Sequence, residues 1–245
     1  MIELVDIWFK YPNTSDYVLR NITLSTRRGE VIAIIGPNGS GKTTLLKIMG
    51  LIYKPNKGQV LINSRDFWSL SDSEKSILKR NIVYVHEKPI LVRGTALDNV
   101  ALGLVLRGVN RNVARRKALM VLETLDLKYL INKDRKSLSA GEAQLVTIAR
   151  AIVVEPKVLL LDEPTANLDL RRRAMLSQIL YELLRRGKTI IIATHDYLFA
   201  LSIAKRIILL ENGELVAEGK PNDLKKELSK AKSSMYRFSQ HFKIL

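Results

Sequence analysis

The sequence predicts an α/β protein whose core is a parallel β-sheet covered by helices. Two observations support this: short apolar runs alternate with helical segments, and one run leads through a glycine-rich turn into a helix. The longest runs, Val31–Ile35, Val158–Leu161 and Ile190–Ala193, carry no charge, as expected of strands buried on both faces. They are far shorter than the roughly 20 residues that span a bilayer. With 245 residues, 47% of them hydrophobic, the chain can bury one substantial core.

The first zone, residues 1–88, is predicted to join an antiparallel β edge to a nucleotide-binding unit. Alternating polar and apolar residues over Ile2–Ile7 and Val18–Leu24 are typical of half-buried strands. The strand Val31–Ile35 then leads through a turn into a helix over Thr43–Met49.

The second zone, residues 89–150, lacks strand character and is predicted to be an inserted helical subdomain, since Ala118, Val121, Leu122 and Leu125 recur at helical spacing.

Strand and helix alternate again in the third zone, residues 151–220, which is predicted to complete the parallel-sheet core begun by residues 1–88. Its predicted elements are strands over Val158–Leu161, Thr189–Thr194 and Arg206–Leu210 and a helix over Leu170–Arg186 that Gly187 ends. We expect residues 1–220 to form one domain and residues 221–245 to form a C-terminal helical tail.

The charge and the chain start limit the functional classes. Forty Lys and Arg against 24 Asp and Glu give +16, which raises the possibility of nucleic acid or an anionic membrane as a partner. The basic residues are spread over segments that resemble exposed helix faces, so solvated surface explains most of them, with attraction to anionic headgroups as a secondary role. The start lacks the basic and apolar regions of a secretory signal and the chain has no cysteine, which together predict a cytosolic chain.

The glycine-rich turn has the spacing G-x-x-x-x-G-K-[ST] of a phosphate loop. Backbone N–H groups of such a loop and of the following helix start surround the phosphates of a nucleotide. Lys42 is expected to reach the terminal phosphates and act in catalysis, and the Thr43 hydroxyl to hold Mg²⁺. A glycine-rich surface turn is the alternative, and the strand and helix on either side disfavour it. The predicted phosphate-binding residues are Gly36, Pro37, Asn38, Gly39, Ser40, Gly41, Lys42, Thr43 and Thr44.

Two acids, Asp162 and Glu163, end the apolar strand that starts at Val158. The carboxyl ends of parallel strands form the ligand-binding edge of such sheets. Asp162 is therefore the expected Mg²⁺ partner. Because successive residues of a strand point to opposite sides, Glu163 can address a water in line with the γ-phosphate and is the candidate general base. Taken alone, a strand that ends in solvated acids is the simpler explanation; the phosphate loop favours the functional one.

Leu138–Glu142, with the sequence Leu-Ser-Ala-Gly-Glu, resembles the LSGGQ signature of the ATP-binding-cassette family of ATPases, which is a branch of the P-loop NTPases. The resemblance covers about residues 2–219. It implies that Ser139, Ala140, Gly141 and Glu142 bind the ATP held by a second ATPase subunit, so that one chain carries only half of each site.

Other elements follow in the family's order. Tyr11 resembles the aromatic residue that stacks on adenine, with Trp8 or Phe9 as alternatives. The segment Ala166–Asp169 resembles the loop that crosses the dimer interface, although Asp169 could also cap a helix. His195 resembles the switch histidine that contacts the γ-phosphate, with a capped or surface histidine as the simpler alternative.

Two motifs depart from the family pattern, the glutamine loop at one position and the signature at two. Glu87 stands where the family has the glutamine of its glutamine loop. A carboxylate keeps acceptor oxygens for Mg²⁺ but lacks the amide N–H that could position water. In the signature, Ala140 and Glu142 replace Gly and Gln, and an acid in the first turn suits a helix N-terminus.

The resemblance implies an ATPase that uses ATP and Mg²⁺, forms a homo- or heterodimer, and drives solute transport through a separate transmembrane permease. It implies a peripheral position on the cytoplasmic side of the membrane. Gly94–Leu104 and Arg107–Gly108 resemble importer subunits, loosely those for oxyanions such as tungstate or molybdate, which implies a solute-binding protein in the same system. The alternative is a family ATPase that acts on nucleic acid or ribosomes, which the absence of a second cassette and of long coiled coils disfavours.

Overall fold

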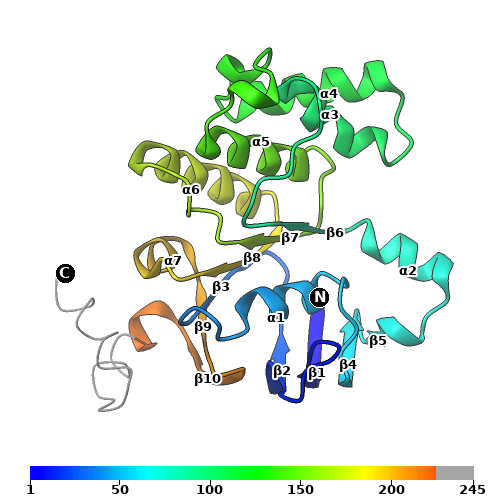
Figure 1. Cartoon of the computed structure of the whole chain (residues 1–245), viewed down its shortest axis with the longest axis vertical. Coiled ribbons are helices and arrows are strands. Elements are labelled where there is room, and N and C mark those ends of the chain that lie inside the picture. The colour runs from blue at the N-terminus through cyan, green and yellow to red at the C-terminus, as the bar shows by residue number, and fades with distance from the viewer. Residues whose placement is uncertain (225–245) are drawn as a thin grey trace.

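The computed structural model describes residues 1–224, which form two β-sheets and seven α-helices (Figure 1). Strands cover Ile2–Phe9 (β1), Leu19–Ser25 (β2), Val31–Ile35 (β3), Lys57–Ile62 (β4), Arg65–Asp66 (β5), Ile82–Val85 (β6), Val158–Asp162 (β7), Thr189–Thr194 (β8), Arg206–Glu211 (β9) and Glu214–Gly219 (β10). Helices cover Lys42–Met49 (α1), Asp72–Lys79 (α2), Ala96–Val105 (α3), Arg111–Thr124 (α4), Ala140–Ile152 (α5), Leu170–Arg185 (α6) and Tyr197–Ile203 (α7).

The larger sheet has the order β10-β9-β3-β8-β7-β6. Its strands pair in parallel from β9 through β6, and β10 is antiparallel to β9. The smaller sheet, β2-β1-β4-β5, is antiparallel throughout. The predicted class, an α/β fold with a parallel core and an antiparallel β edge, is confirmed.

Alternate residues of the central strand β3 face two different hydrophobic cores. Val31, Ala33 and Ile35 pack with residues of α3 to α7. Ile32 and Ile34 pack with α1 and the antiparallel sheet. The parallel sheet is therefore the middle layer, with most helices on one face and α1 with the second sheet on the other (Figure 1). Its carboxyl edge stays open between the two.

The structure corrects several predicted boundaries. The predicted end of the helical insertion at Arg150 falls inside α5, because the apolar face of that helix continues through Ile152. Helix α2 lies within residues 1–88, where only the helix after the glycine-rich turn was predicted, and the strands β4, β5, β6 and β10 were not predicted. Helix α1 begins at Lys42 rather than Thr43, and α6 ends at Arg185. The predicted C-terminal tail lies outside the described residues after Leu224. Within residues 1–224, the helices are all too short or too polar to cross a lipid bilayer.

Candidate functional site

The turn after β3 requires glycine at two positions. Gly36 has φ +156°, and a Cβ there would lie 2.0 Å from the carbonyl oxygen of Leu210. Gly41 has φ +102°, and its Cβ would lie 2.8 Å from the side chain of Leu19. Helix α1 begins directly after Gly41 without a side-chain cap, so its first N–H groups stay available to a ligand.

Lys42, the first residue of α1, is buried beneath this turn. Its ammonium group donates hydrogen bonds of 2.9 Å to the carbonyl oxygens of Gly36 and Pro37. Burial lowers the pKa of Lys42, and the nearby carboxylates of Glu163 and Asp162 oppose that effect. The predicted phosphate-binding lysine therefore lies between the turn and the acids at the end of β7.

Asp162 is the last residue of β7 and binds two hydroxyl groups. Thr43 Oγ1 donates to its Oδ1 over 3.0 Å, and the phenol of Tyr84 donates to its Oδ2 over 2.7 Å. Burial raises the pKa of Asp162, although both hydrogen bonds lower it. Burial, together with Asp162 itself, raises the pKa of Tyr84 far above its usual value, so the phenol remains a donor.

Thr43 and Asp162 fit a magnesium ion by the chemistry of their oxygens and their direct contact. Mg²⁺ usually takes one or two protein carboxylates when substrate phosphates and water supply most of its other ligands. Among the described residues, no group of three or more His, Asp and Glu side chains could form a metal cage without such outside ligands. The arrangement suits an ion that arrives with a nucleotide.

Glu163 leaves the strand geometry that the sequence suggested. Its φ of +43° is left-handed, whereas Asp162 still belongs to β7. One carboxylate oxygen accepts a hydrogen bond from Thr194 Oγ1 (2.9 Å); the other accepts one from the backbone N–H of His195 (3.0 Å) and lies 2.9 Å from His195 Nδ1. The two acids thus face different partners, as expected, but a backbone turn separates them rather than strand alternation.

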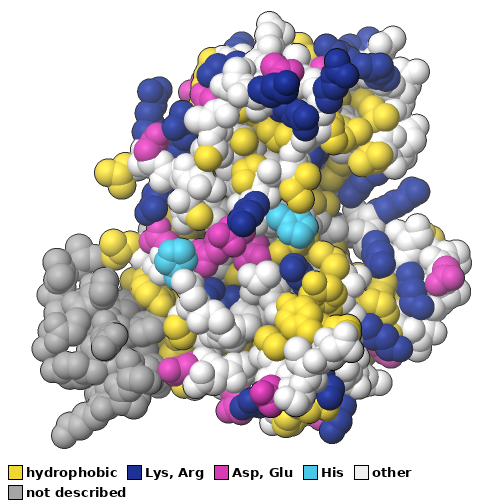
Figure 2. Space-filling view, in the orientation of Figure 1, with side chains coloured by type: hydrophobic (Ala, Val, Ile, Leu, Met, Phe, Trp, Pro, Cys, Tyr) yellow, Lys and Arg dark blue, Asp and Glu magenta, His cyan; other side chains and the backbone are white. Residues whose placement is uncertain are grey.

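A pocket of about 480 Å³ opens at the carboxyl edge of the parallel sheet. Figure 2 shows acidic and histidine side chains gathered in the middle of one face of the molecule, between its helical and β-rich parts. The pocket brings together many of the predicted nucleotide-binding and catalytic residues. It is lined by Tyr11, Val18, Asn38, Gly39, Gly41, Lys42, Thr43, Thr44, Glu87, Glu163 and His195.

Of the three aromatic residues proposed to stack on adenine, Tyr11 lines the pocket. Its hydroxyl lies 2.9 Å from Thr44 Oγ1, which ties the ring to α1. Phe9 is buried and stacks on Tyr53, and Trp8 makes an edge contact with Tyr17 instead. The geometry therefore favours Tyr11 over Trp8 and Phe9.

The segment that resembles the signature forms the start of α5. Ser139 caps the helix in a capping box with Glu142: its hydroxyl accepts from the Glu142 N–H, and the Glu142 carboxylate accepts from the Ser139 N–H. A Cβ on Gly141 would lie 2.7 Å from the carbonyl oxygen of Asn167, so this glycine lets the helix approach residues 166–169. Ala140 is exposed at the helix start.

Glu142, the acid that replaces glutamine in this segment, is buried and paired. It lies 3.0 Å from Lys133 and 3.7 Å from Arg172. Burial acts to raise the pKa of Glu142, but the Ser139 N–H and the two cations outweigh it, so the pKa is lowered. The carboxylate is therefore held in its charged form.

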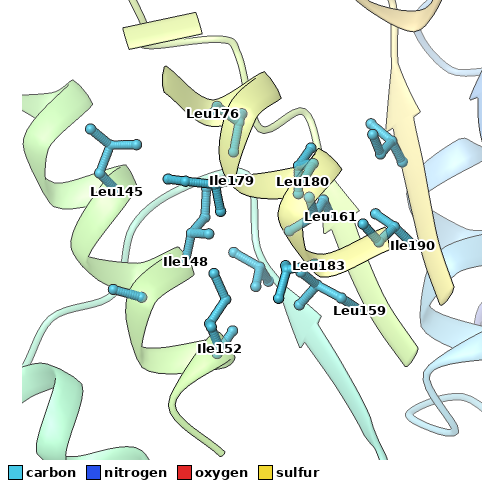
Figure 3. Close-up of a cluster of buried hydrophobic side chains, with 14 of the residues drawn as sticks. Leu145, Ile148, Ile152, Leu159, Leu161, Leu176, Ile179, Leu180, Leu183 and Ile190 are labelled. Atoms are coloured by element: carbon cyan, nitrogen blue, oxygen red, sulfur yellow. The ribbon is translucent and has the colours of Figure 1, made fainter. Parts of the chain in front are cut away.

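Helix α5 is attached firmly to the core behind the site. Leu145, Ile148 and Ile152 of α5 pack toward side chains of α6 and the strands β7 and β8 (Figure 3). Their burial fixes the position of Ser139 relative to Glu163, and each buried aliphatic side chain contributes about 1.5–3 kcal/mol.

The residues that resemble the signature and interface loop do not line the pocket. In the part of the chain that the structure describes, the pocket-lining side chains come from other segments, and Ser139 to Glu142 and Asp169 lie outside them. Asp169 caps α6 by accepting from the Arg172 N–H, so the predicted capping role is present. Within one chain, the pocket-lining residues and the signature and interface segments are therefore separate.

Sequence reasoning missed two residues that contact the acids. Neither Tyr84, which donates to Asp162, nor Thr194, which donates to Glu163, was among the predicted site residues. The available signal was a polar residue at or near the carboxyl end of an apolar strand. Thr194 ends β8 and Tyr84 precedes the last residue of β6, and β6, β7 and β8 are neighbours that end at the same edge.

Comparison with known proteins gives a consistent family. The profile of a family described as ABC transporter matches residues 19–166, and one described as an AAA domain of a putative AbiEii toxin, type IV toxin–antitoxin system, matches residues 136–202. A putative ABC transporter ATP-binding protein of Pyrococcus furiosus is 38% identical over 88% of this chain and 82% of its own length. The cell division ATP-binding protein FtsE of Bacillus subtilis is 35% identical over 89% of this chain and 96% of its own length.

A molybdate/tungstate import ATP-binding protein, WtpC of Pyrococcus horikoshii, is 39% identical over 89% of this chain but only 61% of its own length. Among solved structures, a dimeric ATP-binding cassette in a post-hydrolysis state with ADP and Pi has a TM-score of 0.83 and 34% identity, covering 90% of this chain and 99% of that one. A CbiO1 subunit from Clostridium perfringens, part of an ABC transporter complex, has a TM-score of 0.82 and 29% identity, covering 99% of this chain and 98% of that one.

Proposed function

Because this chain belongs to the ABC transporter family of ATP-binding cassettes, and is therefore an ATPase, we propose that it hydrolyses ATP as one half of a dimer that drives a separate transmembrane permease. The observation that carries the proposal is the pocket that joins Lys42, Glu163 and His195, while Ser139 stands elsewhere on the same chain.

In the proposed mechanism, Lys42 and the backbone N–H groups of Gly36 and of residues 38–44 hold the phosphates, and Tyr11 stacks on the base. Glu163 accepts the proton of the attacking water. Thr194 and the His195 backbone orient its carboxylate, which places the acceptor oxygen before reaction. The His195 side chain lines the pocket next to Glu163 and would contact the γ-phosphate.

Thr43 and Asp162 are the proposed protein ligands of Mg²⁺, with Glu87 as a third. A bound Mg²⁺ neutralises charge on the phosphate oxygens. Glu87 lines the pocket, and its charge acts on Asp162 to raise the pKa of that carboxyl. A cation bound in the pocket would offset the repulsion between these two carboxylates.

The second half of the site is proposed to come from the partner subunit. Ser139 and the N–H groups at the start of α5 would bind the terminal phosphate of the nucleotide held by the other chain, and the segment Ala166–Asp169 would lie at the interface. The separation of these residues from the pocket within one chain supports this, as does the likeness to a cassette solved as a dimer with ADP and Pi.

Coupling to transport, and import as its direction, are the finer part of the proposal. They are supported by the likeness to WtpC, whose name describes molybdate/tungstate import. The partners proposed are a second ATPase subunit, a permease on whose cytoplasmic side the chain binds, and a solute-binding protein. The transported compound would contact the permease rather than this chain, so the ATPase residues do not specify it.

Purification of the intact chain from membranes of the cells that naturally produce it tests this proposal. We expect a multi-span membrane protein, identified by mass spectrometry, to co-purify in stoichiometric amount and to change the ATPase rate when both are reconstituted. Nucleic acid retained in a salt-sensitive manner, without a membrane protein, would instead favour an ATPase acting on nucleic acid. A cell-division complex would favour the role named for the FtsE relative.

Glu87→Gln tests the acid at the glutamine-loop position. The amide keeps one oxygen for the metal and adds an N–H donor for the attacking water, so we expect ATP turnover to be unchanged or raised. The measurement is steady-state ATPase activity with the Mg²⁺ concentration varied. Turnover below about a tenth of wild type, roughly 1.4 kcal/mol in barrier, would show that the carboxylate charge is required.

A further inference from the structure

Arg173, near the start of α6, contacts two loops that are distant in sequence. Its Nε donates to the carbonyl oxygen of Leu168 (3.1 Å), and its Nη1 donates to Asp196 Oδ2 (2.6 Å). The Asp196 side chain is only 15% exposed, so the ion pair is partly shielded from water. One planar guanidinium thus holds residues 166–169 against the loop that follows β8.

The loop after β8 also holds the candidate general base. The Asp196 N–H donates to Thr194 Oγ1 (3.0 Å), and that hydroxyl donates to Glu163 Oε2 (2.9 Å). The backbone N–H of His195, the residue before Asp196, donates to Glu163 Oε1 (3.0 Å). These contacts connect the Leu168 carbonyl to the Glu163 carboxylate. The path runs through Arg173 to the Asp196 side chain, and from the Asp196 N–H through the Thr194 hydroxyl to Glu163.

The preceding residue, Arg172, anchors the other end of the same segment. Its Nη1 lies 2.7 Å from Asp169 Oδ2, and its Nη2 lies 3.7 Å from Glu142 at the start of α5. Two consecutive arginines thus connect residues 166–169 in opposite directions, Arg172 toward the signature segment and Arg173 toward Glu163. A displacement of the segment cannot leave both sets of contacts unchanged.

We propose that Arg173 is a positioning residue that couples the contact between residues 166–169 and the second subunit to the orientation of the Glu163 carboxylate. The inference rests on the proposed dimeric ATPase, because the segment meets a partner only in the dimer. Arg173 contacts Leu168 and Asp196, neither of which lines the nucleotide pocket. Its loss should therefore affect hydrolysis and not ATP binding.

Arg173→Gln is the first test, with Arg171→Gln as the matched control on the exposed side of the same helix. We expect Arg173→Gln to lower kcat about 10-fold, the scale of coupling that such networks carry, with the KM for ATP changed no more than about two-fold. In a Glu163→Gln background, it should leave the ATP concentration needed for dimerisation unchanged. If Arg173 only stabilised the fold, its loss would change kcat, the KM for ATP and the ATP concentration needed for dimerisation together.

Asp196→Asn supplies an independent variant, because asparagine keeps the oxygen that caps α7 but loses the charge that pairs with Arg173. If the two residues act as one link, the double variant should be no slower than the slower single variant.

The link would be overturned if Arg173→Gln kept kcat within about two-fold of wild type, if Arg171→Gln lost as much activity, or if the two single losses multiplied in the double variant. A wild-type chain that neither hydrolyses ATP nor dimerises would instead overturn the proposed function. An active, dimer-forming wild type with an unaffected Arg173→Gln variant would overturn the link alone.

Discussion

Glu163→Gln is expected to lower ATP turnover by about 10²- to 10⁴-fold, the contribution typical of a positioned general base. The amide cannot take the proton of water, and its N–H₂ group would face the Thr194 hydroxyl or the His195 N–H that the carboxylate now accepts from. Binding of ATP should persist, because Lys42 and the turn before it are unchanged. The measurements are steady-state turnover, nucleotide affinity and sedimentation at saturating MgATP.

A stable dimer of the Glu163→Gln protein with bound ATP is the second expected result, since association no longer ends in hydrolysis. Glu123→Gln is a suitable control: its carboxylate pairs with Lys128 at the surface, and its loss should leave turnover unchanged. A Glu163→Gln protein that stayed monomeric at saturating MgATP, even with its permease present, would contradict the proposal that two subunits complete each ATP site. Near-normal turnover would show that another group accepts the proton.

Lys42→Ala is expected to lower kcat/KM for ATP by about 10²- to 10⁴-fold. If the ammonium donates two hydrogen bonds to phosphate oxygens, as the proposed function requires, the loss follows, because bonds to charged groups contribute roughly 1.5–3 kcal/mol each. The variant should still fold, because alanine suits the first turn of α1 and Pro37, one of the two residues whose carbonyl accepts from Lys42, is exposed.

The matched control for Lys42→Ala is Lys47→Ala on the same helix, whose ammonium lies 5.3 Å from the ring centre of Tyr53 outside the pocket lining. Titration with a fluorescent ATP analogue and thermal unfolding of each protein distinguish lost binding from lost structure. Equal nucleotide affinity in wild type and Lys42→Ala would mean that the phosphates bind elsewhere.

Two strands of the parallel sheet could be predicted to the residue because each is a short uncharged run. Val31–Ile35 was predicted with the bounds that the structure has, and Thr189–Thr194 likewise. Helix α2 could not be predicted in the same way: it buries no residue and follows a capping box at Ser71, so hydrophobic periodicity carried no signal.

Some features of the candidate site could likewise be predicted from the sequence, and others could not. The sequence by itself determined the phosphate loop, the pair Asp162 and Glu163 at the carboxyl edge of the sheet, and the segment that starts α5, because spacing along the chain sets local backbone geometry. It did not determine that Tyr84 binds Asp162, that Glu163 adopts a left-handed backbone, or that Arg173 joins residues 166–169 to Asp196. The contact between Tyr84 and Asp162, for example, joins residues 78 positions apart in the chain. Only the pairing order of the strands and the packing of α5 and α6 bring them together, because a hydrogen bond forms where two groups meet in space, whatever their separation in sequence.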